Sequence, residues 1–169
     1  MKIDMPKQQE KEEFLLKLQQ IEKDLYIIAK TRVKDENETA DIIQDTIIAA
    51  FENYHRLRQK EFFKTWMIRI LINHCNSYYR KRRHVIFLED YQKQEKAQGD
   101  MLKDNMSFQE LIQDLDKEEK TILTLYYQLQ YTTKEIGQIL HKKDSTIRSK
   151  IKRAKEKLKR QYEGGNQDE

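Results

Sequence analysis

Positive charge concentrates in one short stretch near the C-terminal end of the chain. Between His141 and Arg160, ten Lys and Arg residues face only two acids, Asp144 and Glu156. That window carries a net charge of +8, whereas the whole chain carries only +4. A second basic cluster, Arg80 to Arg83, lies near the middle. Such concentrated charge is typical of proteins that bind polyanions, although a single Lys-rich helix is often only a solvated surface.

The context of the basic stretch favours DNA binding over a solvated surface. Thr132 and Glu135 have the spacing of a capping box, in which each side chain bonds to the other residue's backbone N–H, so they predict a short helix. Ser145 is predicted to begin a second, longer helix, and Gly137 is expected to let the two helices approach closely. The longer helix has one narrow apolar stripe: Ile147, Ile151, Ala154 and Leu158. A helix-turn-helix is therefore predicted at about 132–160, with its basic second helix in the major groove.

The residues on the other side of that second helix are the candidate DNA contacts. Arg can bond to guanine O6 and N7 with two hydrogen bonds, whereas Lys acts mainly as a point charge on phosphates. The predicted base-reading set is Arg148, Ser149, Lys150, Lys152 and Arg153. We expect Lys157, Lys159 and Arg160 to face phosphate or solvent.

The rest of the chain predicts an all-α protein, because it holds only four Gly and one Pro. Apolar residues at spacings of three and four predict a first helix at about 9–33. Asn37 is predicted to cap a second helix, and a third amphipathic run begins at Phe63. The apolar sides of these three helices are predicted to pack together into a small bundle at 9–83.

Periodicity fades after the bundle, so residues 84–107 are predicted to form a flexible linker. Ser107 and Glu110 form another capping-box pattern, which predicts a helix that runs through Ile112 and Leu115. Asp116 is predicted to cap the next helix. The predicted architecture is two small helical domains, 9–83 and 108–162, of which the second contains the helix-turn-helix.

Enzymatic chemistry finds no support in the residue types. The four His residues are scattered, there is no Cys-x-x-Cys pair, and there is no glycine-rich phosphate loop. We therefore expect no catalysis, no metal and no cofactor. The single cysteine, Cys75, and the lack of a long apolar segment or a secretory signal predict a cytoplasmic, soluble protein.

Two separate parts of the sequence resemble extracytoplasmic-function (ECF) sigma factors. The run Tyr131-Thr-Thr-Lys-Glu-Ile-Gly-Gln-Ile-Leu, followed by Ser145-Thr-Ile-Arg-Ser-Lys-Ile-Lys-Arg-Ala-Lys-Glu-Lys-Leu, resembles the domain that reads the −35 promoter element. The runs Ala40-Asp-Ile-Ile-Gln-Asp-Thr-Ile-Ile-Ala-Ala-Phe and Phe63-Lys-Thr-Trp-Met-Ile-Arg-Ile-Leu-Ile-Asn resemble the domain that docks on polymerase and opens the promoter. The resemblance covers about 9–83 and 108–160.

The resemblance implies partners and residue roles. The implied partners are core RNA polymerase, promoter DNA and an anti-sigma factor that is often membrane-anchored. The implied polymerase contacts are Asp41, Gln44 and Asp45. The implied contacts to the unpaired −10 strand are Arg69, Asn73, His74, Asn76, Ser77 and Arg80. Phe62 or Phe63 would support base separation by stacking on a base. However, Phe63 and Trp66 are three residues apart, which favours a buried position in the core for Phe63 and Trp66.

The chain departs from the family pattern at the turn between the last two helices. His141, Lys142, Lys143 and Asp144 stand where the family usually has a Gly and, soon after, an apolar residue and a Pro. Two alternative functions remain at this point: a stand-alone helix-turn-helix regulator with a sensing or dimerising N-terminal bundle, and a structural helical adaptor. Binding to core polymerase together with run-off transcription separates these three functions.

Overall fold

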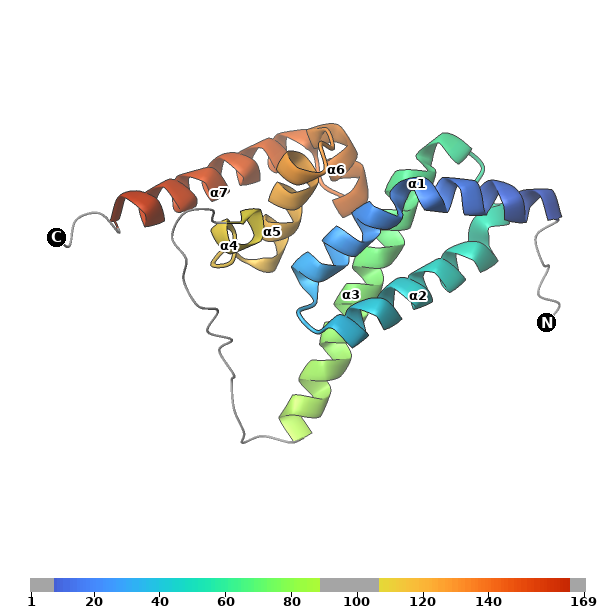
Figure 1. The fold of residues 1–169 in the computed structure, drawn as a ribbon. Helices are drawn as coiled ribbons and strands as arrows, with labels where there is room; N and C mark the ends of the chain where they lie inside the picture. Colours follow the sequence, from blue (N-terminus) through green and yellow to red (C-terminus); the bar gives the residue numbers. More distant parts are fainter. Residues whose placement is uncertain (1–7, 89–106, 165–169) are drawn as a thin grey trace.

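Three long helices form the N-terminal bundle of the protein. The computed structural model describes residues 8–88 and 107–164. Helices α1 (Gln8–Arg32), α2 (Glu36–Asn53) and α3 (Phe63–Leu88) pack on one another, with the short 3-10 turns η1 (Tyr54–Arg56) and η2 (Lys60–Phe62) between α2 and α3. Figure 1 shows α3 crossing the other two helices. The described residues contain no strand, which agrees with the predicted all-α class.

The core of the bundle is made by the apolar stripes that the sequence predicts. Phe14 meets Tyr54 and Phe63 edge to face, with ring centroids 5.3 and 5.5 Å apart. Phe63 is buried, as expected from its spacing, and Trp66 packs against the core from a half-buried position. Phe62, by contrast, is 40% exposed, so it is the member of the Phe62–Phe63 pair that can reach a nucleobase.

Four helices and one π-helical turn form the C-terminal unit. They are α4 (Phe108–Leu111), α5 (Lys117–Leu123), the π-helical turn η3 (Thr124–Gln128), α6 (Thr133–Leu140) and α7 (Asp144–Gly164). The capping boxes at Ser107–Glu110 and Thr132–Glu135 are both present. Asp116 caps α5 as predicted and forms a third capping box with Glu119. These caps stop each short helix from fraying, because they satisfy the free N–H groups of its first turn.

The turn between α6 and α7 is closed without a glycine in the left-handed position. His141 takes that position itself, with φ 54°, while the N–H of Lys142 bonds to the carbonyl of Gly137. A Cβ atom on Gly137 would lie 2.6 Å from the carbonyl oxygen of Lys142. Gly137 is thus needed because the backbone of the turn, at Lys142, lies close to α6. The close approach of the two helices that was expected at Gly137 is instead an approach of this turn.

Several local predictions were wrong. Asp35, not Asn37, caps α2, because its side chain accepts a hydrogen bond from the N–H of Glu38 at 3.0 Å. Helix α7 begins at Asp144, one residue before Ser145, since the carbonyl of Lys143 already accepts helical hydrogen bonds. The helix predicted to run through Ile112 and Leu115 ends at Leu111, although both side chains are buried.

The predicted linker also starts too early. Helix α3 extends to Leu88, so residues 84–88 are helical, and Ser107 belongs to the capping box of α4. The remaining linker residues, 89–106, lie outside the described part of the chain. Within the described ranges, no helix has the length and apolar character required to cross a membrane.

The N-terminal bundle and the C-terminal unit pack against each other. Helices α5 and η3 contact α1, and α6 contacts α3, as seen at the centre of Figure 1. We call this contact the interdomain seam. Its polar bonds join Asp24, Thr31 and Arg32 of α1 and Arg69 of α3 to residues of the C-terminal unit: Gln109, Thr121, Thr124, Tyr131 and Gln138. The sequence predicted two domains but not this docking.

Candidate nucleic-acid interface

Helix α7 turns three chemically different sides to its surroundings. Ile147, Ile151 and Ala154 are buried and attach the helix to α5 and α6. The exposed side carries most of the predicted base-reading residues: Arg148, Ser149, Lys152 and Arg153. The Arg148 side chain is 70% exposed and forms an ion pair with Asp144 one turn earlier, at 2.7 Å. The helix therefore presents several hydrogen-bond donors to a partner outside the chain.

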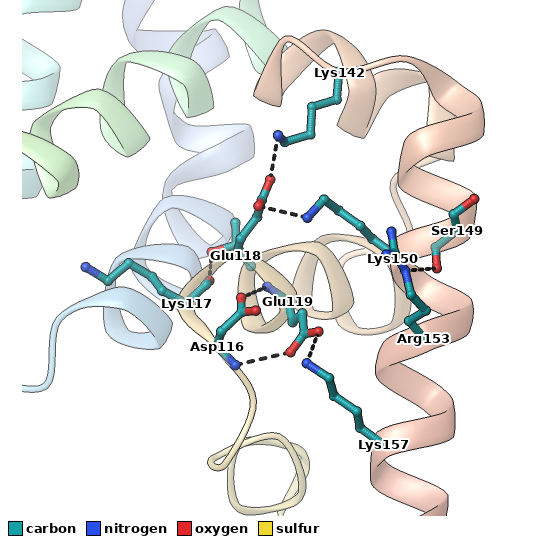
Figure 2. Close-up of polar contacts among 10 residues, drawn as sticks. Asp116, Lys117, Glu118, Glu119, Lys142, Ser149, Lys150, Arg153 and Lys157 are labelled. Atoms are coloured by element: carbon teal, nitrogen blue, oxygen red, sulfur yellow. Dashed lines mark hydrogen bonds and ion pairs between the residues drawn. The ribbon is translucent and has the colours of Figure 1, made fainter.

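One flank of α7 is neutralised by the start of α5. Glu118 lies between Lys142 and Lys150, with N–O distances of 3.0 Å to each, and Lys157 reaches Glu119 (Figure 2). Burial disfavours the charged form of Glu118, but its hydrogen bonds and charge interactions with both lysines outweigh burial and hold its pKa below the ordinary value. Lys150 is thus a predicted base-reading residue that is already paired with an acid of another helix, whereas the acid that pairs with Arg148 lies on α7 itself.

The opposite flank of α7 keeps its positive charge. A groove of about 550 Å³ runs there between α7 and η3, with Tyr126, Tyr127 and Ile151 among its walls. Its basic residues are Arg148, Lys152, Lys155 and Lys159. Only two of these four pair with an acid in the described part of the chain, Arg148 with Asp144 and Lys159 with Glu163. Lys155, which the sequence did not single out, belongs to this basic flank.

A second polar stripe runs along α3. Arg69, Asn73, Asn76 and Arg80 follow one another at spacings of four, three and four, so they share one face of the helix. Asn73, Asn76 and Arg80 are exposed, whereas His74 and Ser77, beside the stripe, are half-buried. The hydroxyl of Ser77 accepts a hydrogen bond from Arg80 at 2.9 Å. The structure thus brings the six predicted −10 residues onto one side of α3.

One member of this stripe, Arg69, takes part in the interdomain seam, and a second, Asn76, is linked to the seam through Arg32. The guanidinium of Arg69 donates to the carbonyl oxygen of Gln138 in α6, at 2.6 Å. The amide oxygen of Asn76 accepts from Arg32 at 2.6 Å, and Arg32 also donates to Thr121 of α5. Arg32 is a site residue that the sequence did not reveal, because a single Arg at the end of a helix has many possible roles.

The predicted polymerase contacts lie on the outer face of α2. Asp41, Gln44 and Asp45 are all exposed. Ile48, one turn further along the same face, is 50% exposed, although isoleucine side chains are usually buried in folded proteins. The face therefore combines carboxylates with one exposed apolar side chain, which the sequence did not predict.

Comparison with protein families agrees with both halves of this arrangement. Residues 18–85 match the family model for sigma-70 region 2, and residues 105–158 match the model for sigma-70 region 4. The chain is similar to the RNA polymerase sigma factor SigV of Bacillus subtilis, at 26% identity over 78% of this chain and 80% of the relative. It is also similar to the ECF RNA polymerase sigma factor SigX of the same organism, at 24% identity over 90% and 84%.

The chain belongs to the ECF subfamily of sigma-70 factors. As a sigma factor, it binds core RNA polymerase and directs transcription initiation at promoters. The stand-alone regulator and the structural adaptor are not favoured by these matches.

Two solved structures share the fold of this sigma factor. RpoE of Bartonella quintana, in complex with the anti-sigma factor NepR, matches 86% of this chain and 94% of its own, with a TM-score of 0.72 and 21% identity. CnrH, in complex with the cytosolic domain of CnrY, matches 89% and 88%, with a TM-score of 0.66 and 18% identity. Sigma factors in general are not enzymes, and the described residues hold no cluster of three or more potential metal ligands.

Proposed function

We propose that the exposed side of α7 reads the −35 duplex. The observation that carries this assignment is the capped helix-turn-helix, whose second helix leaves Arg148, Ser149, Lys152 and Arg153 open to a partner. Arg148 reads a base, and the lysines of the basic flank hold phosphates. Lys150 contributes only if its ammonium group leaves Glu118 and binds DNA instead. The C-terminal domain, at about 108–162, is in this view the −35-binding unit, and 9–83 is the −10 and polymerase unit.

The stripe on α3 is the proposed site for the unpaired −10 strand. An amide such as that of Asn73 donates and accepts at once, which suits an exposed Watson–Crick edge. Arg69 and Arg80 flank the amides and supply charge for the strand's phosphates, and Phe62 offers an exposed ring for stacking. His74 and Ser77 border the same face. The sigma factor opens the promoter because these residues bind the single strand better than the duplex.

The outer face of α2 is the proposed polymerase contact. Asp41, Gln44 and Asp45 lie within the two turns before the exposed Ile48 on the same face, so the face suits a basic surface with an apolar hollow. An apolar centre with a charged rim gives a docking site both affinity and orientation.

An anti-sigma factor is the further proposed partner. Both matched sigma-factor structures, RpoE and CnrH, are complexes, and that of RpoE is explicitly one with an anti-sigma factor. A membrane anchor, where such a complex has one, would belong to the anti-sigma factor and not to this chain. The sigma factor itself acts in the cytoplasm, where polymerase works, and contributes placement and strand capture in place of catalysis.

Charge reversal on α2 tests the polymerase assignment. We expect Asp45→Lys to weaken capture of core RNA polymerase and to lower run-off transcription about tenfold, because it sets a positive charge against a basic surface. Asp114→Lys is the matched control, since Asp114 is an exposed acid of the C-terminal unit. Equal polymerase capture by both variants contradicts the α2 contact.

A further inference from the structure

The interdomain seam covers part of the proposed −10 site. Arg69 and Asn76 belong to the stripe on α3, yet each is bonded within the chain, Arg69 to the carbonyl of Gln138 and Asn76 to Arg32. The C-terminal unit stands on the same side of the helix, because α6 packs on α3. A single strand that lies along the stripe must take both residues from these partners.

Arg32 connects the two halves at this point. One nitrogen of its guanidinium donates to the hydroxyl of Thr121 in α5, and another donates to the amide oxygen of Asn76 in α3, both at 2.6 Å. The Tyr79 hydroxyl of α3 donates to the backbone carbonyl of Arg32. One residue of α1 thus holds a strand-reading amide and the C-terminal unit in one hydrogen-bonded group.

The docked state carries an electrostatic cost. Arg32 is 7% exposed, and within 8–88 and 107–164 it forms no ion pair, while its Nε atom is buried without a partner. Lys117, whose ammonium lies 3.0 Å from the centroid of the Tyr79 ring, faces the same region. Burial, then the charges of Arg32 and Arg83, lower the pKa of Lys117.

A buried cation without a counter-ion is unfavourable, and it regains water when the two halves separate. Hydrogen bonds and packing therefore hold the seam against the desolvation cost of the buried Arg32 charge. Such a balance is expected of a contact that opens when the protein functions. A docking contact without this penalty would resist opening.

We propose that the C-terminal unit masks the −10 site of the free sigma factor, with Arg32 as the latch. Docking of the C-terminal unit and capture of the unpaired strand compete for Arg69, while Arg32 holds Asn76 within the N-terminal bundle and bonds to the docked Thr121. A partner that separates the two halves uncovers the stripe, and one that holds them together keeps the factor inactive. This inference rests on the proposed −10 role of the α3 stripe.

A reversible cross-link across the seam tests the masking. The hydroxyl oxygens of Thr31 in α1 and Thr124 in η3 lie 3.5 Å apart, which suits a disulfide between cysteines at these positions. Neither residue is a proposed DNA or polymerase contact. The double variant Thr31→Cys, Thr124→Cys provides its own control, because oxidation locks the docked state and reduction releases it. The native Cys75 is buried, and burial raises the pKa of its thiol, so it competes poorly for oxidation.

The readout is binding of a labelled random-sequence DNA single strand of about 15 nucleotides. We expect the oxidised full-length protein to bind this strand at least about tenfold more weakly than the reduced protein, with binding restored by reductant. Binding to duplex DNA through α7 should be the same in both states. Equal single-strand binding in the two redox states overturns the masking.

A second variant opens the seam without a cross-link. Thr121→Val removes the acceptor of Arg32 but keeps the side-chain shape, and a buried donor left without a partner disfavours docking. We expect single-strand binding to rise by about fivefold. Thr46→Val makes the same chemical change in the core of the N-terminal bundle, where Thr46 bonds only to its own helix, and should not raise binding.

Two further variants separate this inference from the −10 assignment itself. Asn73→Ala and Arg80→Ala, measured in the reduced double-cysteine protein, report whether the stripe binds the strand, because Arg80 bonds to Ser77 of its own helix and neither residue belongs to the seam bonds. If neither weakens binding, the proposed −10 stripe is wrong and the masking falls with it. If both weaken binding but oxidation has no effect, the stripe stands and only the masking is overturned.

Discussion

The ammonium group of Lys150 on α7 lies 3.0 Å from the carboxylate of Glu118 on α5, which also holds Lys142 at the same distance. Thirty-two residues separate Lys150 from Glu118 in sequence. The pair fixes one side of the recognition helix to the body of the C-terminal unit. Glu118 also neutralises the positive charges of Lys142 and Lys150, which could otherwise contact DNA. Glu118 should therefore raise the stability of the fold and lower its affinity for DNA.

Replacing Glu118 by Gln should change the acid part of the stability profile. Because the folded pKa of Glu118 lies below its ordinary value, its stabilising effect is present above the unfolded pKa of about 4.3 and is lost as the pH falls through the folded pKa. Since the side chain is 37% exposed, solvent screens the pair and we expect a loss of only about 0.5 kcal/mol at neutral pH. Denaturant unfolding measured at neutral pH and over a series of falling acid pH values tests this, and the difference between variant and parent should shrink as the pH falls through the folded pKa.

The same variant should bind DNA more tightly. Freed from Glu118, Lys142 and Lys150 can reach phosphates, so the salt dependence of duplex binding should become steeper by up to about two phosphate contacts. Glu13→Gln is the matched control, because it removes an acid that pairs with Lys17 in the N-terminal bundle, away from α7. A salt dependence that is unchanged in Glu118→Gln contradicts this account.

Arg148 and Lys159 should respond differently to removal, although both are basic residues of α7. Arg148→Ala is expected to relax the preference for the −35 sequence, at a cost of about 1–3 kcal/mol on the preferred site. Lys159→Ala should weaken all sequences evenly and lower the salt dependence by about one contact. Binding to a panel of −35 variants at several salt concentrations distinguishes them. Equal effects of the two variants across the panel would count against base reading by Arg148.

Gly137→Ala should destabilise the helix-turn-helix. The added Cβ would lie 2.6 Å from the backbone carbonyl of Lys142, so either the turn or α6 must move. We expect a loss of about 2 kcal/mol in the free energy of unfolding, together with weaker −35 binding. Gln138→Ala, at the next and exposed position of α6, serves as control and should leave the thermal midpoint nearly unchanged. A midpoint in Gly137→Ala equal to that of the control would show that the turn adapts without strain.

Local patterns in the sequence predicted the helices, the caps and the identity of the family. Apolar residues at spacings of three and four indicated which side of each helix is buried, because that periodicity follows from the helix itself. The capping boxes at Ser107 and Thr132 were predictable for the same reason, since their partners lie three residues apart. Errors arose where neighbouring residues offered equivalent caps, as with Asp35 and Asn37, and where α3 continued past the predicted end at Arg83 to Leu88.

Contacts between distant segments were decided only by the tertiary structure. No local pattern links Arg32 to Thr121, Arg69 to Gln138, or Lys150 to Glu118, because each pair meets only after separate helices have packed. The sequence by itself determined that α7 is basic and that α3 carries polar residues on one face. The tertiary structure decided which of those charges are neutralised and which of the proposed strand-reading residues are already bonded within the chain, since burial and pairing depend on what stands opposite each side chain.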